Sequence, residues 1–432
     1  MRIALHAAIA LVLSAIAAWA ASPAVHVAVD RSERKKVIGL AEQLRKLSPE
    51  KGELEVTDKE TADGSDENVW QIVFRWAQSP QDKEPAAEVE QTKPNPWPRV
   101  SATAEEAGKV RALLLEAAGD SFRGEPPETW RVAGLPDASG RRVEIVFPGP
   151  QTGISKARQF RVARHFVALL MRHLGMDPQE EKPFKAGLFE GRVLANYDAE
   201  GVGYGGSTLL DRAVDETSLD ARILPVCPED IRDSVLDGAA GVMFPGGSGK
   251  AIAKALQPEG VEKVRDFVAA GGGYYGVCAG AYFANSGLKE YAALMPLKHH
   301  QPWRKGKGML QVTLTEEGKK LLGNEFAEFE TRYNCGPVFT EMTGPLPGSP
   351  QKPVKVLANF SSAVTDREGM TRNEMLGTPA ILSGQWGNGL VITVSPHPES
   401  HPELSVLVAR AIALSLGLDP QNIRTGKKIG QA

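Results

Sequence analysis

Two patterns of apolar and polar residues alternate along the second half of the chain. Short apolar runs predict buried strands, and most are followed by a segment whose apolar residues recur at helical spacing. The predicted strands are 192–197, 221–226, 241–244, 273–277 and 390–395, and the predicted helices are 207–214, 228–236 and 258–270. Such alternation is typical of an α/β fold with a doubly wound, mostly parallel sheet, in which chemistry collects at the carboxyl ends of the strands.

The residues before this domain show a less regular pattern. The predicted elements there are strands at 69–76 and 142–147 and helices at 101–118 and 155–174. Thr103 and Glu106 stand at capping-box spacing in the first helix. The polar, proline-rich stretch 78–98 predicts an exposed loop. His165 and His173 lie two turns apart in the second helix without a third ligand, which favours a packed or solvated face over a metal site.

These patterns divide the chain into domains. They predict a smaller α+β domain of unknown role across 22–180, followed by a linker at 178–185. The α/β domain then covers 186–420, and a tail covers 421–432.

The N-terminal segment has the features of an export signal. Arg2 precedes an almost wholly apolar stretch, and Ala18-Trp19-Ala20 fits a small-x-small cleavage site. We expect residues 1–20 to be a signal peptide cleaved near Ala20, which makes the mature protein periplasmic or secreted. An uncleaved signal anchor is the alternative. Because no later stretch has the length and apolarity of a spanning helix, we expect no membrane span after signal removal.

Composition and net charge limit the classes of partner that the protein is expected to bind. The chain is 42% hydrophobic and 24% charged, as soluble globular proteins are, and its net charge of −3 favours neither nucleic acid nor an anionic membrane. The three cysteines, an odd number, leave at least one thiol outside any disulfide. A Cys227–Cys335 bridge stays open, because spacing does not reveal proximity.

The pentapeptide Gly276-Val277-Cys278-Ala279-Gly280 carries the strongest chemical signal. It follows a predicted strand and precedes a predicted helix, which is the setting of a nucleophile elbow. The backbone at the nucleophile is strained there, so small neighbours at Gly276 and Gly280 prevent clashes. We therefore expect Cys278 to be a nucleophile rather than a buried thiol in an ordinary turn.

Two further motifs supply what a cysteine nucleophile needs. His397-Pro398-Glu399 follows a predicted strand and offers a base with an orienting carboxylate. The Pro245-Gly246-Gly247 loop ends another strand and offers N–H donors to a developing oxyanion. We assign these donors to Gly247, with Gly246, and to Ala279. A phosphate-binding loop fits poorly, because no Gly-Lys-Ser/Thr sequence follows at the required spacing.

Together these motifs resemble the class I glutamine amidotransferase-like superfamily, across about residues 190–417. More narrowly, the chain resembles the domain at the N-terminus of fungal-type biotin–protein ligases. The stretches that carry this likeness are 197–201, 244–247, 276–282 and 333–337. The resemblance implies a flavodoxin-like α/β fold, the residues Cys278, His397 and Glu399 as catalytic groups, and no biotin-ligase activity, because the ligase's catalytic domain has no counterpart here.

One position departs from the family pattern. Members that use glutamine carry Gln four residues after the cysteine, and this chain has Tyr282. We therefore widen the expected substrate to a small-molecule amide or a peptide bond. We assign Tyr282, Asp198, Tyr333 and Asn334 to substrate binding, with structural turn residues as the alternative for Tyr333 and Asn334. The pair His299-His300 is better explained as a solvated loop than as a pocket rim or a metal site.

Two functions follow from these residues. The first is an exported cysteine hydrolase that cleaves an amide or peptide bond through a Cys278-His397-Glu399 triad and a thioester, with no cofactor and no metal. The alternative is a non-catalytic module of the cell envelope that keeps the fold and binds a ligand or a partner. The identity of any protein partner is left open.

Overall fold

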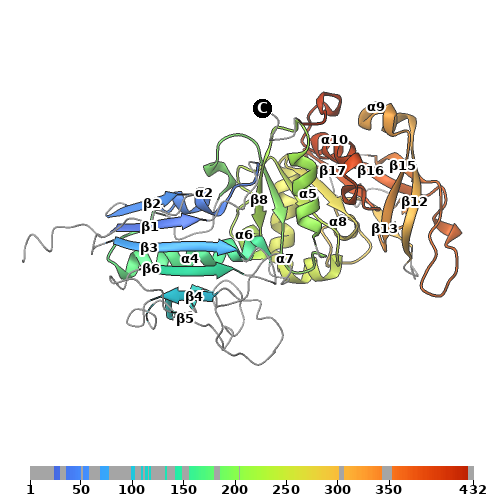
Figure 1. The fold of residues 1–432 in the computed structure, drawn as a ribbon. Coiled ribbons are helices and arrows are strands. Elements are labelled where there is room, and N and C mark those ends of the chain that lie inside the picture. The colour runs from blue at the N-terminus through green and yellow to red at the C-terminus, as the bar shows by residue number, and fades with distance from the viewer. Residues whose placement is uncertain are drawn as a thin grey trace, which may run out of the picture. The chain divides into compact units, whose positions relative to one another are not determined.

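The computed structural model describes residues 24–29, 36–49, 52–57, 69–76, 99–102, 109, 112–114, 116–117, 132–133, 142–147, 155–179, 185–203, 205–300, 306–342 and 353–426. The chain divides into two compact units. The first comprises Met1–Glu33 and Gly39–Lys182, and the second comprises Arg34–Ile38 and Pro183–Ala432. Figure 1 shows the elements of both. The predicted signal peptide and the loop at 78–98 lie outside the described residues.

The first unit is built on a six-stranded sheet in the order β2-β1-β3-β6-β4-β5. Its elements are β1 (Ala24–Val29), α2 (Leu40–Arg45), β2 (Glu53–Thr57), β3 (Val69–Trp76), β4 (Arg99–Ala102), β5 (Val132–Ala133), β6 (Arg142–Phe147) and α4 (Lys156–His173). Strand β1 lies parallel to β2 and β3, and β4 runs antiparallel to β6. The predicted strands β3 and β6 are confirmed.

Helix α4 is confirmed together with its boundaries. The Ser155 side chain accepts a hydrogen bond from the Arg158 N–H and so caps the helix, and Leu174 ends it. Its buried side chains, among them Phe160 and Phe166, pack in the core of the first unit.

The helix predicted at 101–118 begins too early. Residues 101 and 102 belong to β4, where they pair with β6, because tertiary pairing overrides a local helical pattern. Residues 109, 112–114 and 116–117 are helical. Thr103 and Glu106, the expected capping box, lie outside the described residues.

The second unit contains a nine-stranded sheet in the order β13-β12-β15-β16-β17-β10-β9-β7-β8. Five neighbouring strands are parallel: β8 (Arg222–Val226), β7 (Val193–Tyr197), β9 (Gly241–Phe244), β10 (Gly273–Val277) and β17 (Gly389–Val394). They correspond to the five strands predicted from apolar runs, which confirms the α/β fold class. Val37 adds a parallel bridge beside Ile223 of β8.

Helices follow these parallel strands. They are α5 (Gly206–Asp215), α6 (Pro228–Arg232), α7 (Gly249–Ala269), α8 (Ala279–Ala284) and α10 (Ser405–Ser415). Short 3-10 turns are η2 (Ala186–Leu188), η3 (Asn324–Phe326), η4 (Asn373–Met375), η5 (Pro398–Ser400), η6 (Pro402–Leu404) and η7 (Pro420–Asn422). Within the part of the chain that the structure describes, no helix is both long and apolar enough to cross a membrane.

Two helix boundaries differ from the prediction. Helix α6 ends at Arg232, four residues early. Helix α7 begins at Gly249, capped by Ser248, rather than at Pro258. Gln257 has a non-helical backbone, with φ 60°, immediately before Pro258. Proline disfavours the helical region for the residue before it, so the sequence pattern revealed only the second of two joined helices.

The other half of the sheet was not predicted. The antiparallel strands β16 (Pro379–Trp386), β15 (Lys355–Phe360), β12 (Lys307–Leu314) and β13 (Glu328–Asn334) extend it beyond β17. Helix α9 (Glu316–Leu322) joins β12 to β13, and β11 (Leu297–His299) pairs with β14 (Phe339–Met342) in a separate ribbon. The antiparallel strands matter to function because β13 ends beside the candidate site.

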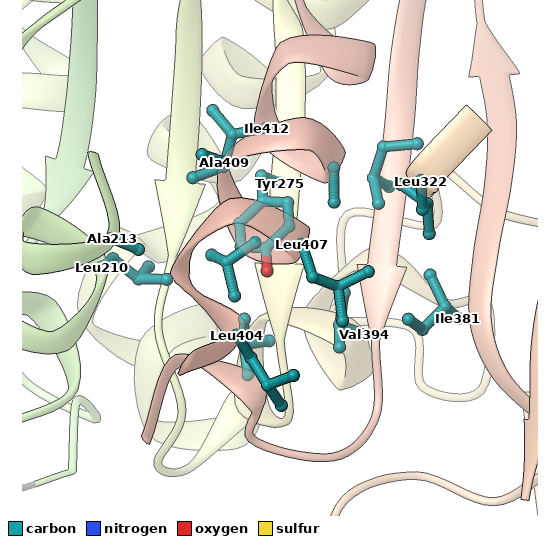
Figure 2. Close-up of a cluster of buried hydrophobic side chains, with 14 of the residues drawn as sticks. Leu210, Ala213, Tyr275, Leu322, Ile381, Val394, Leu404, Leu407, Ala409 and Ile412 are labelled. Atoms are coloured by element: carbon teal, nitrogen blue, oxygen red, sulfur yellow. The ribbon is translucent and has the colours of Figure 1, made fainter. Parts of the chain in front are cut away.

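Strand β10 is an inner strand of the parallel half and lies between β9 and β17. Its residues Tyr274 and Tyr275 are both buried and belong to different core clusters, so they point to opposite faces of the sheet. Figure 2 shows Tyr275 among apolar side chains of helix α10 and the neighbouring strands. The expectation that both are core aromatics is confirmed.

The two tyrosines make a matched pair for a stability test. The Tyr274 hydroxyl donates to the Gly280 carbonyl at 2.8 Å, whereas the buried Tyr275 hydroxyl finds no partner among the described residues. We expect Tyr274→Phe to lower the free energy of unfolding by about 1 kcal/mol and Tyr275→Phe to leave it unchanged or raise it. Urea unfolding of both variants checks this. A larger loss for Tyr275→Phe than for Tyr274→Phe contradicts it.

Candidate functional site

Cys278 lies at the sharp turn between β10 and α8. Its backbone has φ 47° and ψ −94°, a region that non-glycine residues rarely occupy. The Cys278 N–H donates to the Val394 carbonyl at 2.8 Å, and the Cys278 carbonyl accepts from the Tyr282 N–H at 2.9 Å. These bonds fix the turn between the end of β17 and the first turn of α8. The strained backbone costs about 1–3 kcal/mol, which the surrounding core must offset.

The glycines flanking Cys278 are required by space. A Cβ at Gly276 would lie 2.6 Å from the carbonyl carbon of Gly280, and one at Gly280 would lie 2.2 Å from the carbonyl oxygen of Phe244. Both contacts are closer than real Cβ atoms allow, and both are with backbone atoms, so relieving them would require the backbone to move. Strand β10 can therefore turn directly into α8 only because these two positions lack side chains.

His397 and Glu399 follow the end of β17, next to Cys278. The His397 Nδ1 atom lies 2.7 Å from Glu399 Oε1; the Glu399 side chain is buried, and the His397 side chain is 12% exposed. The backbone of this segment is held from two sides. The His397 N–H donates to the Arg332 carbonyl of β13 at 2.7 Å, and Arg212 of α5 donates to the Glu399 carbonyl at 2.7 Å. The carboxylate can thus orient the imidazole.

The charge state of His397 follows from its neighbours. Burial lowers the pKa of the imidazole, but the Glu399 carboxylate and the Cys278 sulfur outweigh burial and raise this pKa to about 10. The ring is therefore a cation at neutral pH, paired with a buried carboxylate. Its Nε2 atom makes no hydrogen bond with any described residue, so it is available to a group that enters the site.

The Pro245-Gly246-Gly247 loop lies against both side chains. A Cβ at Gly246 would be 2.5 Å from His397 Cε1 and 3.6 Å from Cys278 Cβ. Both distances start from the same point, so those two atoms lie within about 6 Å of each other. Gly246 is the position at which the histidine and the cysteine converge.

Gly247 is held by a neighbouring loop. It forms an antiparallel bridge with Val202, in which the Gly203 N–H donates to the Gly246 carbonyl and the Ser248 N–H donates to the Gly201 carbonyl. The Gly247 N–H is not used by this bridge. Gly247 has φ 147°, and a Cβ there would lie 2.0 Å from the Gly201 oxygen, so only glycine fits. The Ala279 N–H is the first of α8 and has no acceptor within that helix.

Tyr282 connects the elbow helix to a turn after β13. Its hydroxyl donates to the Cys335 carbonyl at 3.2 Å, and its ring packs edge-on against His299 at 4.9 Å. Burial, followed by the charge on Cys278, raises the pKa of this hydroxyl. The Tyr282 hydroxyl therefore stays protonated and donates its hydrogen bond to the turn that contains Cys335. His299 also lies 3.3 Å from the side chain of Asn285, so it is part of a packed network rather than a solvated loop.

The same turn contacts the sulfur of Cys278. The Asn334 carbonyl lies 3.5 Å from Cys278 Sγ. Tyr333 is fully buried and its hydroxyl donates to the Gly336 carbonyl at 2.6 Å, so this side chain supports the turn and faces the core. A Cβ at Gly336 would lie 2.2 Å from the Ser395 carbonyl, so the turn packs directly against the chain that leads to His397.

Asp198 has a structural contact of its own. Its Oδ1 accepts a hydrogen bond from the Ser207 hydroxyl at 2.9 Å, and its N–H donates to the Val226 carbonyl. It therefore shapes the loop between β7 and α5, which in turn holds Gly247.

No cysteine is in a disulfide, so the bridge between Cys227 and Cys335 that the sequence left open is not formed. Cys227 instead lies at the start of α6, with its sulfur 3.1 Å from Asp230 Oδ2. Among the described residues no three side chains of the metal-binding types gather into a cluster.

Sequence reasoning missed the residues that act through their backbone or from distant strands. The Arg332 and Asn334 carbonyls come from an antiparallel strand that had not been predicted, and Arg212 gives no local signal in α5. The stretch 333–337 could be found only through its family likeness.

Comparison with known proteins agrees with the resemblance. Residues 231–293 match the model of the family described as "Biotin-protein ligase, N terminal", which confirms the narrower likeness over those residues. The comparison with curated proteins gives no match. The second unit has the α/β fold with a parallel half-sheet that the sequence predicts.

Several solved structures are similar to this chain. PurLQS from Thermotoga maritima is 15% identical, with 52% of this chain and 97% of that chain covered and a TM-score of 0.36. A ThuA-like protein from Parabacteroides merdae is 16% identical, with 55% and 92% covered and a TM-score of 0.36. A cytoplasmic protein from Salmonella typhimurium is 10% identical, with 52% and 99% covered and a TM-score of 0.34.

The charge state of His397 predicts how stability depends on pH. Because its pKa rises on folding from 6.5 to about 10, protonation of His397 stabilises the fold. That contribution is complete below about pH 6.5 and is lost as the pH rises through about 10. We expect the difference in unfolding free energy between the wild type and His397→Gln to shrink over this range, by on the order of a few kcal/mol. Urea unfolding at a series of pH values measures it.

Glu399→Gln provides the control for this effect, because it removes the carboxylate and keeps the shape. In that background the pH-dependent difference should become smaller. A difference that does not vary with pH in the wild-type background contradicts the assignment.

Proposed function

We propose that the second unit is a cysteine hydrolase that cleaves an amide or peptide bond. The observation that carries the proposal is the convergence on Gly246, where Cys278 at its strained turn meets the His397–Glu399 pair. A thiol next to an imidazole that is itself oriented by a buried carboxylate is the arrangement used for nucleophilic attack on acyl carbons. Neither a metal nor a cofactor takes part in this proposal.

The first half of the reaction forms a thioester. The Cys278 sulfur, as a thiolate paired with the His397 cation, attacks the carbonyl carbon of the substrate. The carbon–nitrogen bond then breaks, and His397 gives its proton to the leaving amine. The raised pKa of His397 keeps this proton available at neutral pH.

The second half restores the enzyme. With its proton gone, His397 Nε2 accepts a proton from water, and the hydroxide attacks the thioester carbon. The sulfur–carbon bond breaks and the acid leaves. Glu399 holds the ring in one orientation through both steps.

The oxyanion of each tetrahedral intermediate needs N–H donors. The Gly247 N–H, outside the bridge that holds its loop, and the Ala279 N–H, the first of α8, are the candidates. Gly246 contributes because its lack of a side chain leaves the space that the His397 ring occupies.

Tyr282 bears on the substrate class. A tyrosine lacks the side-chain amide with which family members hold a glutamine substrate. The Tyr282 hydroxyl is also already bonded to the Cys335 carbonyl. We therefore assign the substrate to amides and peptide bonds in general. On the N-terminal apolar segment alone, we propose that the protein acts outside the cytoplasm.

A second candidate function, a ligand-binding module, is favoured by one observation. The Cys278 thiol donates to the Asn334 carbonyl at 3.5 Å. If the turn at 334–336 holds the sulfur permanently in this orientation, the cleft binds a ligand without cleaving it.

Turnover of an amide and peptide library by the full-length protein and three variants tests the hydrolase. We expect Cys278→Ala and His397→Ala to lower the rate on the order of a thousandfold or more and Glu399→Gln to lower it on the order of a hundredfold. Lys250→Ala, on the exposed side of α7, is the matched control and should keep the wild-type rate.

Acid quenching followed by intact-mass measurement adds a direct readout. An acyl group should appear on wild-type protein and not on Cys278→Ala. Turnover that survives in Cys278→Ala contradicts the mechanism. A library ligand that binds both proteins equally, with no acyl adduct and no turnover, supports the binding module instead.

A further inference from the structure

A second thiol lies beside Cys278. The turn after β13 presents two groups of Asn334, and each meets a different sulfur. The Asn334 carbonyl is 3.5 Å from Cys278 Sγ, and the Asn334 side-chain oxygen is 3.6 Å from Cys335 Sγ. The two cysteines, 57 positions apart in sequence, are therefore separated by one residue in space.

Tyr282 ties these cysteines together. Its N–H donates to the Cys278 carbonyl at 2.9 Å, and its hydroxyl donates to the Cys335 carbonyl at 3.2 Å. Burial, then the charges of Cys278, Tyr291 and Cys335, raise the pKa of that hydroxyl. The Cys335 N–H donates to the Gly306 carbonyl, so the turn is held on its other side as well.

The contact of Asn334 limits how far apart the two cysteines lie. A carbonyl oxygen lies about 2.8 Å from the next Cα along a trans peptide, so the Cys335 Cα is at most about 6 Å from Cys278 Sγ, and the two Cα atoms are at most about 9 Å apart. Cα atoms of disulfide-bonded cysteines usually lie about 4.4–6.8 Å apart. A disulfide therefore requires a change of the Cys335 rotamer together with a movement of the turn toward Cys278.

Cys335 occupies a backbone position that would suit glycine better than cysteine. Cys335 has φ 63°, a conformation that favours glycine. Two of the five non-glycine residues with positive φ in the described part of the chain are Cys278 and Cys335. Both members of the pair thus sit at strained positions, and the turn itself would accept glycine at 335.

We propose that Cys335 is the partner thiol of Cys278 in a reversible disulfide that protects and switches off the site under oxidation. The Cys278 sulfur attacks a peroxide, the oxygen–oxygen bond breaks, and water or an alcohol leaves, so that sulfur is oxidised to a sulfenic acid and the peroxide is reduced. Cys335 then attacks that sulfur, the sulfur–oxygen bond breaks, and the Cys335 proton leaves with the oxygen as water. A dithiol reductant restores both thiols.

This inference concerns the regulation of the site proposed above and rests on a reactive Cys278, but not on cleavage of any amide. The disulfide places Cys278 Sγ out of reach of a substrate. It also prevents further oxidation of Cys278 to acids that cannot be reduced.

The experiment treats the full-length protein with hydrogen peroxide and maps its peptides without reduction. We expect a peptide pair linked through Cys278 and Cys335, an intact mass lower by two hydrogens, and full recovery of both thiols with dithiothreitol. In Cys335→Ser, Cys278 should instead gain oxygen atoms, and the thiol recovered with dithiothreitol should fall about tenfold. Cys335→Gly should behave in the same way, and it relieves the backbone strain, so misfolding does not explain its result.

Cys227→Ser is the matched control, because the Cys227 sulfur is engaged with Asp230 and should not affect the linked peptide. The inference is overturned if the wild type shows no Cys278–Cys335 peptide, or if Cys278 takes up oxygen equally in wild type and Cys335→Ser. Alkylation by iodoacetamide separates this result from the proposed hydrolase. Rapid alkylation without a disulfide overturns the inference alone, whereas a Cys278 that neither alkylates nor oxidises overturns both.

Discussion

The candidate site depends on one backbone constraint, the passage from β10 into α8 at Cys278. The residue adopts φ 47° with a side chain attached, and neither neighbour at the crowded contacts tolerates a Cβ. About 1–3 kcal/mol of strain is typical of such a position. The offset comes from β10 itself, which lies between two parallel strands and buries one tyrosine on each face of the sheet. The packed core therefore holds Cys278 in a backbone conformation that the residue would rarely adopt by itself.

Close backbone approaches connect the remaining parts to this turn. Gly246 leaves room for the His397 ring, Gly247 accepts the loop that follows β7, and Gly336 lets the turn after β13 rest on Ser395. The sequence therefore needs glycines where the loops after β9, β7 and β13 approach the chain around Cys278 and His397. The Glu399 carboxylate is buried inside this frame, 2.7 Å from the His397 imidazole, so removal of either partner would leave the other charge uncompensated.

The parallel half of the sheet could be predicted from sequence because its strands are short apolar runs separated by helices of clear period. The same reasoning placed Cys278 on a turn and His397 at a strand end. It missed β12 and β13, because antiparallel strands with one exposed face alternate apolar and polar residues. It also missed β15 and β16, which lie between these strands and the parallel half without the strand–helix alternation that revealed the parallel strands. It also missed the Arg332 and Asn334 carbonyls, since a backbone group leaves no trace in residue type. Tyr333 was assigned to the substrate side, but period-2 alternation along β13 turns its ring into the core.

The rate at which iodoacetamide alkylates Cys278 at pH 7 tests the pairing of Cys278 with His397 most directly, because this rate reports on the thiolate before any substrate is known. The rate is followed by peptide mapping in wild type and in His397→Gln, with Cys227 in the same molecule as the internal reference. If Cys278 is paired with the His397 cation, it should react on the order of tenfold or more faster than Cys227, and the advantage should disappear in His397→Gln. Equal rates for Cys278 in the two proteins would contradict the account.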